Sequence, residues 1–161
     1  EDVKVTVLRS CTVLGHGAHN LETQALFRPW LFGVMGYNPP LQFVYDSDLA
    51  RVMSIIIQRE IPGTFNVAGD GIVRYHEIVK ILKSRFINLP PFMVYPLTRL
   101  LWWLRLQREM TSTGLDQVRW PILMSTSKLH KATGYRFWHT ALDALTAFAN
   151  SAYLYKDDIS F

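Results

Sequence analysis

The 161 residues are enough for one compact domain with a hydrophobic core of its own. Hydrophobic residues make up 49% of the chain and charged residues 19%, which excludes disorder caused by an excess of charge. The formal net charge is +4, but Lys and Arg form no run of five, so we expect no nucleic-acid partner. Cys11 is the single cysteine, which excludes an intrachain disulfide and a cysteine-rich metal site.

Two segments bear on where the protein is located. The N-terminus has no basic segment followed by an apolar stretch, so no secretory signal is expected and the predicted location is cytoplasmic. Residues 90–106 are the most membrane-like part of the chain, but they are fewer than the roughly 20 apolar residues needed to span a bilayer. They also include Pro96, Arg99 and Arg105, so a transmembrane span is not predicted.

The first elements are a strand and a helix. The β-branched residues 3–8 predict a strand, which ends in a loop that contains Gly15. Apolar residues at helical spacing predict a helix over 21–31, closed by the turn at 38–40. A loop that follows a strand of this kind is where ligands meet α/β sheets.

Residues 41–45 predict the next strand, which leads into a helix. Asp46 and Asp48 precede an apolar helical face over 49–57, and Pro62-Gly63 ends the helix. We interpret the two carboxylates as N-capping groups at the positive end of this helix rather than as a catalytic pair.

A second strand and helix continue the pattern. Residues 64–68 predict a strand, 69–71 a glycine-containing turn, and 78–82 the apolar face of a helix. The alternation of strands and helices is typical of an α/β protein with a parallel sheet.

The C-terminal part has a different composition. After residues 88–91, a bulky apolar helix is predicted over 92–106, followed by a polar joint at 111–114. Residues 122–124 predict a last short strand, and a short helix capped by Ser125 or Thr126 ends at Gly134. A final helix is predicted to begin near Thr140 and to bury Leu142, Leu145 and Phe148.

Four stretches of the chain follow one another in the order and spacing of known motifs. They are VTVLRSCTVLG at 5–15, LQFVYDSDLA at 41–50, PGTFNVAG at 62–69, and STSKL at 125–129 running into Gly134-Tyr135. Together they resemble the C-terminal half of the NAD-dependent epimerases and dehydratases, which are extended short-chain dehydrogenases/reductases.

The resemblance implies an α/β fold made of the C-terminal part of a Rossmann-like parallel sheet and a small mixed α/β, mostly helical substrate domain. It implies that 1–15 and 62–86 belong to the cofactor-domain sheet, and that 16–61 with 87–161 form mainly the substrate domain and the C-terminal helices. It also implies an NAD- or NADP-dependent epimerisation, dehydration or alcohol/ketone interconversion, often on a sugar nucleotide.

Two motifs of that family are absent from this chain. The Gly-rich turn that holds the cofactor pyrophosphate is missing, because the turns at 15–17 and 69–71 lack the third glycine. The Tyr-x-x-x-Lys pair that transfers protons is missing too: Tyr95 is followed by Arg99, and Lys80 stands one residue too far from Tyr75. We therefore assign no catalytic residue here, expect the catalytic machinery upstream of Glu1, and expect this part alone to be inactive.

The same resemblance identifies candidate site residues. Ser10, Cys11 and Thr12 would lie beside the nicotinamide and bind the cofactor. The alternative is that they form an ordinary turn at the end of the strand. The residues implied on the substrate side are Asn20, Gln42 and Tyr45.

Other residues limit the substrate and exclude a metal. Leu41 stands where the family often carries an arginine that meets a nucleotide diphosphate, which leaves a more apolar alcohol or ketone as the alternative to a nucleotide sugar. His16 and His19 are three residues apart without a further cysteine or carboxylate, which is a poor ligand set, so no metal is predicted.

The aromatic stretch that contains Trp102 and Trp103 has several interpretations. Core packing of the small domain is favoured over a substrate pocket, a homodimer interface or a weak membrane contact. The alternative to an enzyme is a non-catalytic binding or assembly module with the same partial fold. Such a module could also bind peripherally to a membrane.

Overall fold

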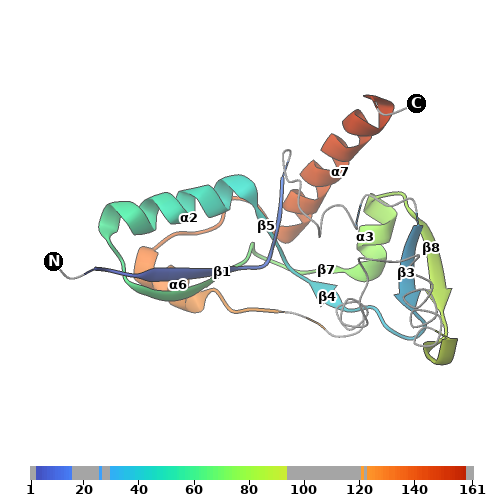
Figure 1. Cartoon of the computed structure of the whole chain (residues 1–161), viewed down its shortest axis with the longest axis horizontal. Coiled ribbons are helices and arrows are strands. Elements are labelled where there is room, and N and C mark those ends of the chain that lie inside the picture. The colour runs from blue at the N-terminus through green and yellow to red at the C-terminus, as the bar shows by residue number, and fades with distance from the viewer. Residues whose placement is uncertain (1–2, 16–25, 27–29, 94–120, 122, 159–161) are drawn as a thin grey trace.

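The computed structural model describes residues 3–15, 26, 30–93, 121 and 123–158. Along the described chain, strands and helices alternate, which confirms the predicted α/β fold class (Figure 1). The elements are β1 (Thr6–Ser10), β2 (Thr12–Leu14), β3 (Trp30–Val34), β4 (Pro40–Leu41), β5 (Phe43–Tyr45), α2 (Asp46–Arg59), β6 (Gly63–Val67), β7 (Val73–Arg74), α3 (Tyr75–Ile81), β8 (Arg85–Leu89), α6 (Ser127–Thr133) and α7 (Ala141–Asp158).

The strands associate in pairs, and most of the pairs are parallel. β1 pairs with β6, β2 with β5 and β3 with β8 in parallel, whereas the short strands β4 and β7 are antiparallel. Cys11 lies between β1 and β2, and its amide donates to the Val67 carbonyl at 3.0 Å. The chain is therefore hydrogen-bonded to β6 as far as Cys11, and from Thr12 onward it pairs with β5.

Helix α2 packs its apolar face into the core cluster that also contains Val44 of β5 and Phe65 of β6. Val52 and Ile56 are buried there, four residues apart on one face of the helix. The helix ends at Arg59, and its C-cap residue Glu60 takes the left-handed conformation with φ 48°. The Glu60 carboxylate accepts from Lys4 at 2.5 Å, which joins the end of the helix to the residues before β1.

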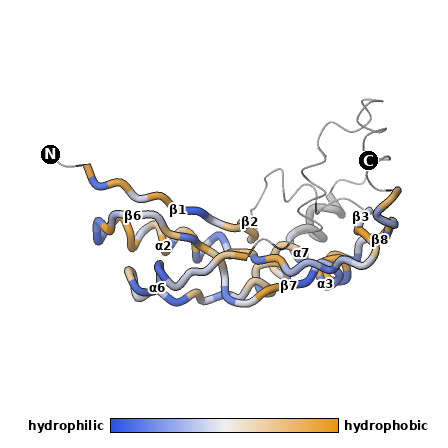
Figure 2. Tube along the Cα trace, turned by 90° about the horizontal axis from the view of Figure 1, so that it is seen from below, coloured by the Kyte–Doolittle hydropathy of each residue, from blue (hydrophilic) through white to orange (hydrophobic). Residues whose placement is uncertain are grey.

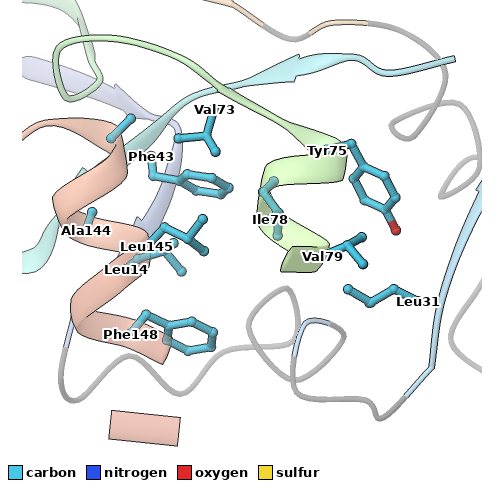
Figure 3. Close-up of a cluster of buried hydrophobic side chains, with 11 residues drawn as sticks. Leu14, Leu31, Phe43, Val73, Tyr75, Ile78, Val79, Ala144, Leu145 and Phe148 are labelled. Carbon is cyan, nitrogen blue, oxygen red and sulfur yellow. The ribbon is translucent and has the colours of Figure 1, made fainter. Parts of the chain in front are cut away.

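Two clusters of buried side chains form the core. One lies around α2, β6 and α6 and includes Val52, Phe65 and Leu129. The other joins α7 and α3 to β2 and β5; Figure 3 shows its side chains pointing toward one another from these elements. Its members with the least exposure are Leu14, Ile78, Ala141, Ala144, Leu145, Val73 and Phe148.

The molecule is elongated in Figure 1, with α2, β1 and α6 toward one end and α3, β3 and β8 toward the other. Figure 2 shows β1 along one side of the first end, with β6 and α2 on its inner side. Among the described residues, no helix is long and apolar enough to cross a membrane.

Three sequence predictions differ from the structure. Trp30 and Leu31 belong to strand β3 instead of a helix over 21–31, because their backbone pairs with β8; most of that predicted helix lies outside the described residues. Leu123 and Met124 are not in a strand, since the Met124 amide donates to the Gln42 side chain at 2.7 Å.

The third difference concerns α7, where Leu142 is 50% exposed although Leu145 and Phe148 are buried as predicted. Leu142 therefore lies away from the core face of the helix. Of the apolar helix predicted over 92–106, residues 94–106 lie outside the described residues.

Candidate functional site

The candidate site lies where two parallel strands end together. The last residues of β1 and β6, Ser10 and Val67, are partners in the register. Ligands of α/β proteins bind at the carboxyl ends of parallel strands. The segment that follows β1 is therefore in the position expected for a ligand contact.

The three residues predicted to bind the cofactor are contiguous at this strand end. Ser10 is exposed, while Cys11 and Thr12 are half-buried. Thr12 is the first residue of β2 and pairs with Phe43. The backbone of this segment is therefore held by β6 at Cys11 and by β5 at Thr12. Contacts with two strands thus determine the backbone path of the segment.

The end of β2 lies close to the start of α2. A Cβ added to Gly15 would lie 2.1 Å from the Asp46 Oδ2 atom, so only glycine permits this contact without a shift of the carboxylate. A Cβ at Gly69, just after β6, would lie 2.6 Å from the Phe43 carbonyl oxygen. Gly15 thereby leaves room for the Asp46 carboxylate at the start of α2, and Gly69 lets the chain after β6 approach Phe43 of β5 closely.

Tyr45, one of the predicted substrate-side residues, ends β5 beside a histidine. Its ring stacks on His139, with 4.2 Å between the ring centroids and 22° between the planes. Burial raises the pKa of the Tyr45 hydroxyl, and the nearby charges of Asp46 and Asp48 raise it further. Tyr45 is therefore a neutral hydrogen-bonding group beside the strand ends.

Of the other two predicted substrate-side residues, Gln42 is the one that the structure describes. The Gln42 side-chain oxygen accepts the Met124 amide at 2.7 Å, so it is engaged in holding the chain near 124. Asn20 lies outside the described residues. Of the three, Tyr45 is the one that the structure places at a strand end next to Cys11 to Gly15.

Asp48 holds the first turn of α2 to a segment about ninety residues later. Its side chain is fully buried. Its Oδ1 atom accepts from the Tyr135 hydroxyl at 2.5 Å and the Trp138 amide at 3.2 Å. Its Oδ2 atom accepts from the amide and Nδ1 of His139 at 3.0 and 2.9 Å.

The predicted role of Asp46 and Asp48 as helix caps is therefore wrong in its detail. Tyr45 is the N-cap residue, and no side-chain capping bond is formed there. The Asp46 carboxylate accepts the adjacent Ser47 amide at 2.6 Å, and Asp48 turns away from its own helix end to bind 135–139. A carboxylate with four donors across the fold has a structural role, as the sequence favoured.

The hydrogen bonds around Asp48 also set its charge. Burial alone would raise the pKa of its carboxyl, but the bonds from Tyr135, His139 and the two backbone amides outweigh burial and lower the pKa. The pKa of Tyr135 is raised to about 12, first by burial and then by its bond to the Asp48 carboxylate. Asp48 is therefore an anion stabilised by donors, with Tyr135 as a neutral one.

Arg51 completes this cluster at the surface. Its guanidinium lies 3.6 Å from Asp48 Oδ1 and 3.7 Å from the centre of the Trp138 ring, which is 68% exposed. Sequence reasoning missed these partners because they are separated from Asp48 by most of the chain. The one local signal was a polar residue at a position of α2 that faces the core.

The described residues contain no group of three or more His, Cys, Asp or Glu side chains that could hold a metal ion.

Comparison with known proteins begins with distant relatives in sequence. No family model matches the chain. Uncharacterised proteins of Mycobacterium bovis and Mycobacterium tuberculosis strain H37Rv are 23% identical to it over 146 residues. That alignment covers 89% of this chain and 38% of each relative, so the chain spans less than half the length of the curated relatives it matches.

Solved structures show what kind of fold this is. The enzyme WbmG of Bordetella bronchiseptica, in complex with NAD and UDP, has a TM-score of 0.63 at 17% identity, over 96% of this chain and 46% of that one. RMD of Pseudomonas aeruginosa, complexed with NADPH, has a TM-score of 0.60 at 14% identity, over 92% and 48%. UDP-N-acetylglucosamine 4-epimerase of Bacillus cereus has a TM-score of 0.56 at 14% identity, over 92% and 46%.

The chain thus has a partial Rossmann-like α/β fold. Solved structures similar to it include epimerases and a dehydratase, several of them crystallised with NAD or NADPH. The chain covers about half of each of those proteins.

Proposed function

We propose that this chain is the substrate-side portion of an NAD(P)-dependent epimerase/dehydratase or alcohol/ketone oxidoreductase. The observation that supports it most is the alignment of 96% of the chain with 46% of an enzyme that holds NAD and UDP. The parallel β1–β6 pair, which ends at the predicted cofactor segment, agrees with it. In this proposal the Gly-rich turn and the Tyr-x-x-x-Lys pair belong to the remainder of a longer protein.

The proposal divides the chain between two domains. Residues 1–15 and 62–86 would belong to the cofactor-domain sheet, and 16–61 with 87–161 mainly to the substrate domain and C-terminal helices. The pairing of β1 with β6 supports the first assignment, because it joins residues from both ranges. Cytoplasmic location and a homodimer remain predictions.

Ser10, Cys11 and Thr12 would line the nicotinamide side of the site. The bond from the Cys11 amide to Val67 and the pairing of Thr12 with Phe43 hold the backbone of this segment, which suits contact with a flat ring through main-chain groups and the Thr12 hydroxyl. A bound nicotinamide would supply the hydride acceptor or donor. The chain's own residues would orient the reactants and exclude water.

Tyr45 would face the substrate from the neighbouring strand. Its stacking on His139 and the bond of His139 to the buried Asp48 hold the ring in one position. Leu41, half-buried in β4, offers no charge to a diphosphate, which supports a more apolar alcohol or ketone over a nucleotide sugar. The substrate in either case would be a small molecule.

The test compares the 161-residue chain with the complete protein that its gene encodes. Binding of NADH and NADPH is followed by fluorescence titration, and turnover is measured with a panel of alcohols, ketones and nucleotide sugars. We expect binding and turnover by the complete protein and almost none by the chain alone. Turnover by the chain at the rate of the complete protein would contradict the proposal that the catalytic residues lie outside this chain. A complete protein that binds neither cofactor would favour the non-catalytic module.

A pair of threonine variants tests the site within the complete protein. Thr12→Val should lower kcat/KM about ten-fold, as expected for one lost hydrogen bond near the reacting atoms. Thr146→Val on the exposed face of α7 is the matched control and should leave kcat/KM unchanged. Equal activities of the two variants would remove Thr12 from the site.

A further inference from the structure

His139 lies where the segment before α7 passes the ends of two strands. Its ring stacks on Tyr45, the last residue of β5, with 4.2 Å between the ring centroids. Its carbonyl oxygen lies beside Gly69, just after β6, where an added Cβ would come within 3.4 Å of it. Both strands belong to parallel pairs, so His139 is at the strand ends where ligands of α/β proteins bind.

His139 is also on the same face of the β2–β5 pair as the predicted cofactor segment. Thr12 is the register partner of Phe43, and partners in a parallel pair place their side chains on one face. Tyr45 is two residues beyond Phe43 and lies on that face again, with His139 stacked on it. The step along the strand is about 7 Å, which a small molecule in contact with Thr12 can span.

Asp48 determines which nitrogen of His139 carries a proton. A carboxylate accepts hydrogen bonds and has none to donate. The Asp48 Oδ2 atom lies 2.9 Å from His139 Nδ1, so Nδ1 is the donor and holds the hydrogen. In the neutral imidazole, Nε2 then carries no hydrogen and is a hydrogen-bond acceptor.

The Nε2 atom of His139 is accessible to a ligand. The side chain is 33% exposed, although the Asp48 side chain that it contacts is completely buried. The hydrogen bonds of His139 are made by its amide and Nδ1, and Nε2 takes part in neither. Among the described residues, the buried side-chain polar atom without a partner is His76 Nε2. His139 Nε2 therefore reaches solvent.

The ring is held in one orientation while Nε2 stays open. Asp48 Oδ2 accepts from both the amide and Nδ1 of His139, at 3.0 and 2.9 Å, which fixes the side chain relative to its own backbone. Tyr45 covers one face of the ring. The Ala141 amide donates to the Asp70 carbonyl at 2.8 Å, which fixes the chain that follows. An acceptor held in this way binds a partner without the cost of ordering its own side chain.

From this geometry we propose that His139 Nε2 accepts a hydrogen bond from a hydroxyl group of the substrate. This role rests on the proposed function and narrows its substrate class. A ketone oxygen has no hydrogen to donate to Nε2, so the form that His139 recognises is the alcohol. Asp48 and Tyr45 are positioning residues, because they act on the substrate through the imidazole.

The state of the imidazole is tested in the 161-residue chain with isotope-labelled histidine rings. Proton–nitrogen correlation by NMR is recorded at about pH 8, where imidazoles are mostly neutral. We expect a histidine with its hydrogen on Nδ1 and none on Nε2, and His139→Asn should remove that signal. A hydrogen on Nε2 of this residue, with Nδ1 bare, would overturn the proposal.

His139→Asn in the complete protein separates the substrate role from the structural one. The asparagine NH₂ group can still donate to Asp48 from the position of Nδ1, but the side chain ends before Nε2. The probes are the alcohol of the panel with the fastest turnover, and its ketone as an inhibitor. We expect KM for the alcohol to rise about ten-fold with kcat within about two-fold, and the inhibition constant of the ketone to stay unchanged.

The matched control is His130→Asn. His130 is also half-buried, and its Nδ1 contacts the Tyr135 carbonyl away from the strand ends. Its replacement should leave KM for the alcohol unchanged. An equal rise of KM and of the ketone inhibition constant in His139→Asn would assign His139 a structural role and overturn the proposal.

Failure of this proposal differs from failure of the proposed function. Turnover by the complete protein with an unchanged KM in His139→Asn would overturn the role of His139 and leave the proposed function standing. A complete protein without turnover would overturn both. In the unmodified complete protein, saturating alcohol should shift the Nε2 resonance of the Nδ1-protonated histidine, and a resonance that does not move would overturn the proposal without any variant.

Discussion

At the scale of single residues, a buried carboxylate with four donors joins two segments that lie far apart in the sequence. Asp48 connects the first turn of α2 to residues 135–139, and both of its oxygens are occupied. An ion in this position is stabilised only while every donor is present, because its hydration has been replaced by these bonds. Removing a donor or the carboxylate is therefore expected to destabilise both α2 and the segment before α7.

Asp48→Asn tests this dependence. An asparagine must place its NH₂ group where one carboxylate oxygen stood, so donors face donors at either His139 or Tyr135. We expect the free energy of unfolding to fall by about 3 kcal/mol, as for a broken buried ion pair. Urea denaturation measures the loss, and Asp70→Asn at an exposed turn is the control, with an expected change below about 0.5 kcal/mol.

The same carboxylate makes stability depend on acid. The pKa of Asp48 is lowered in the folded protein, so the stabilisation is fully present above the unfolded pKa of about 4 and is lost as pH falls through the folded pKa. We expect the free energy of unfolding to drop as pH is lowered from about 5 to 3. Asp48→Asn should reduce that slope, and an unchanged slope would mean that other carboxyls cause the acid sensitivity.

At the scale of an element, α7 shows how one face of a helix meets the core. Phe148 is 1% exposed and packs with Leu145 and Leu14, whereas Leu142 on the same helix is 50% exposed. The apolar residues of α7 therefore contribute unequally although they look alike in the sequence. Burial, not residue type, should decide the cost of removing each one.

We expect Phe148→Ala to lower the free energy of unfolding by about 3–5 kcal/mol, because it leaves a cavity in the core. Leu142→Ala is the matched control on the same helix and should cost less than about 1 kcal/mol. Thermal and urea unfolding of the two variants gives the comparison. Similar losses for both would mean that the outward face of α7 is covered in solution.

The elements that sequence could predict are those with a local pattern. The helix face of Val52 and Ile56, the strand at 64–67 and the glycine stop at Gly134 are all found near their predicted places. β3 was missed because its residues Trp30 to Val34 become a strand only by pairing with β8, about 55 residues later. The partners of Asp48 could not be predicted for the same reason, because a contact between distant segments produces no periodic pattern in the sequence.

The candidate site divides in the same way. Ser10 to Thr12 were singled out because a motif follows a recognisable strand; the structure shows this segment at a parallel strand end, and its cofactor contact stays a prediction. Gln42 stays a predicted substrate residue, and its side-chain oxygen accepts the Met124 amide, a contact determined by the path of residues far along the chain. His139 was not singled out, and only its stacking on Tyr45 brings it to the site.

For the whole molecule, the outer edge of the β1–β6 pair is the part that a longer protein would change most. Val5 and Val7 are 64% and 47% exposed, and β1 has β6 as its described sheet partner. An exposed parallel strand with apolar side chains is unusual, because parallel sheets are normally covered on both faces. If the proposed function is right, the rest of a Rossmann-like sheet and its helices cover this strand.

Val7→Ser therefore has a different expected cost in two contexts. In the 161-residue chain it should change the free energy of unfolding by less than about 0.5 kcal/mol, since the side chain is already near water. In the complete protein the same change should cost about 1–3 kcal/mol, because burial of a valine is lost. Ile57→Ser, on the 71% exposed outer face of α2, is the control and should cost little in both. Equal small costs for Val7→Ser in both proteins would show that nothing further covers this side of β1 in the complete protein, which would contradict the expected continuation of the sheet and its helices.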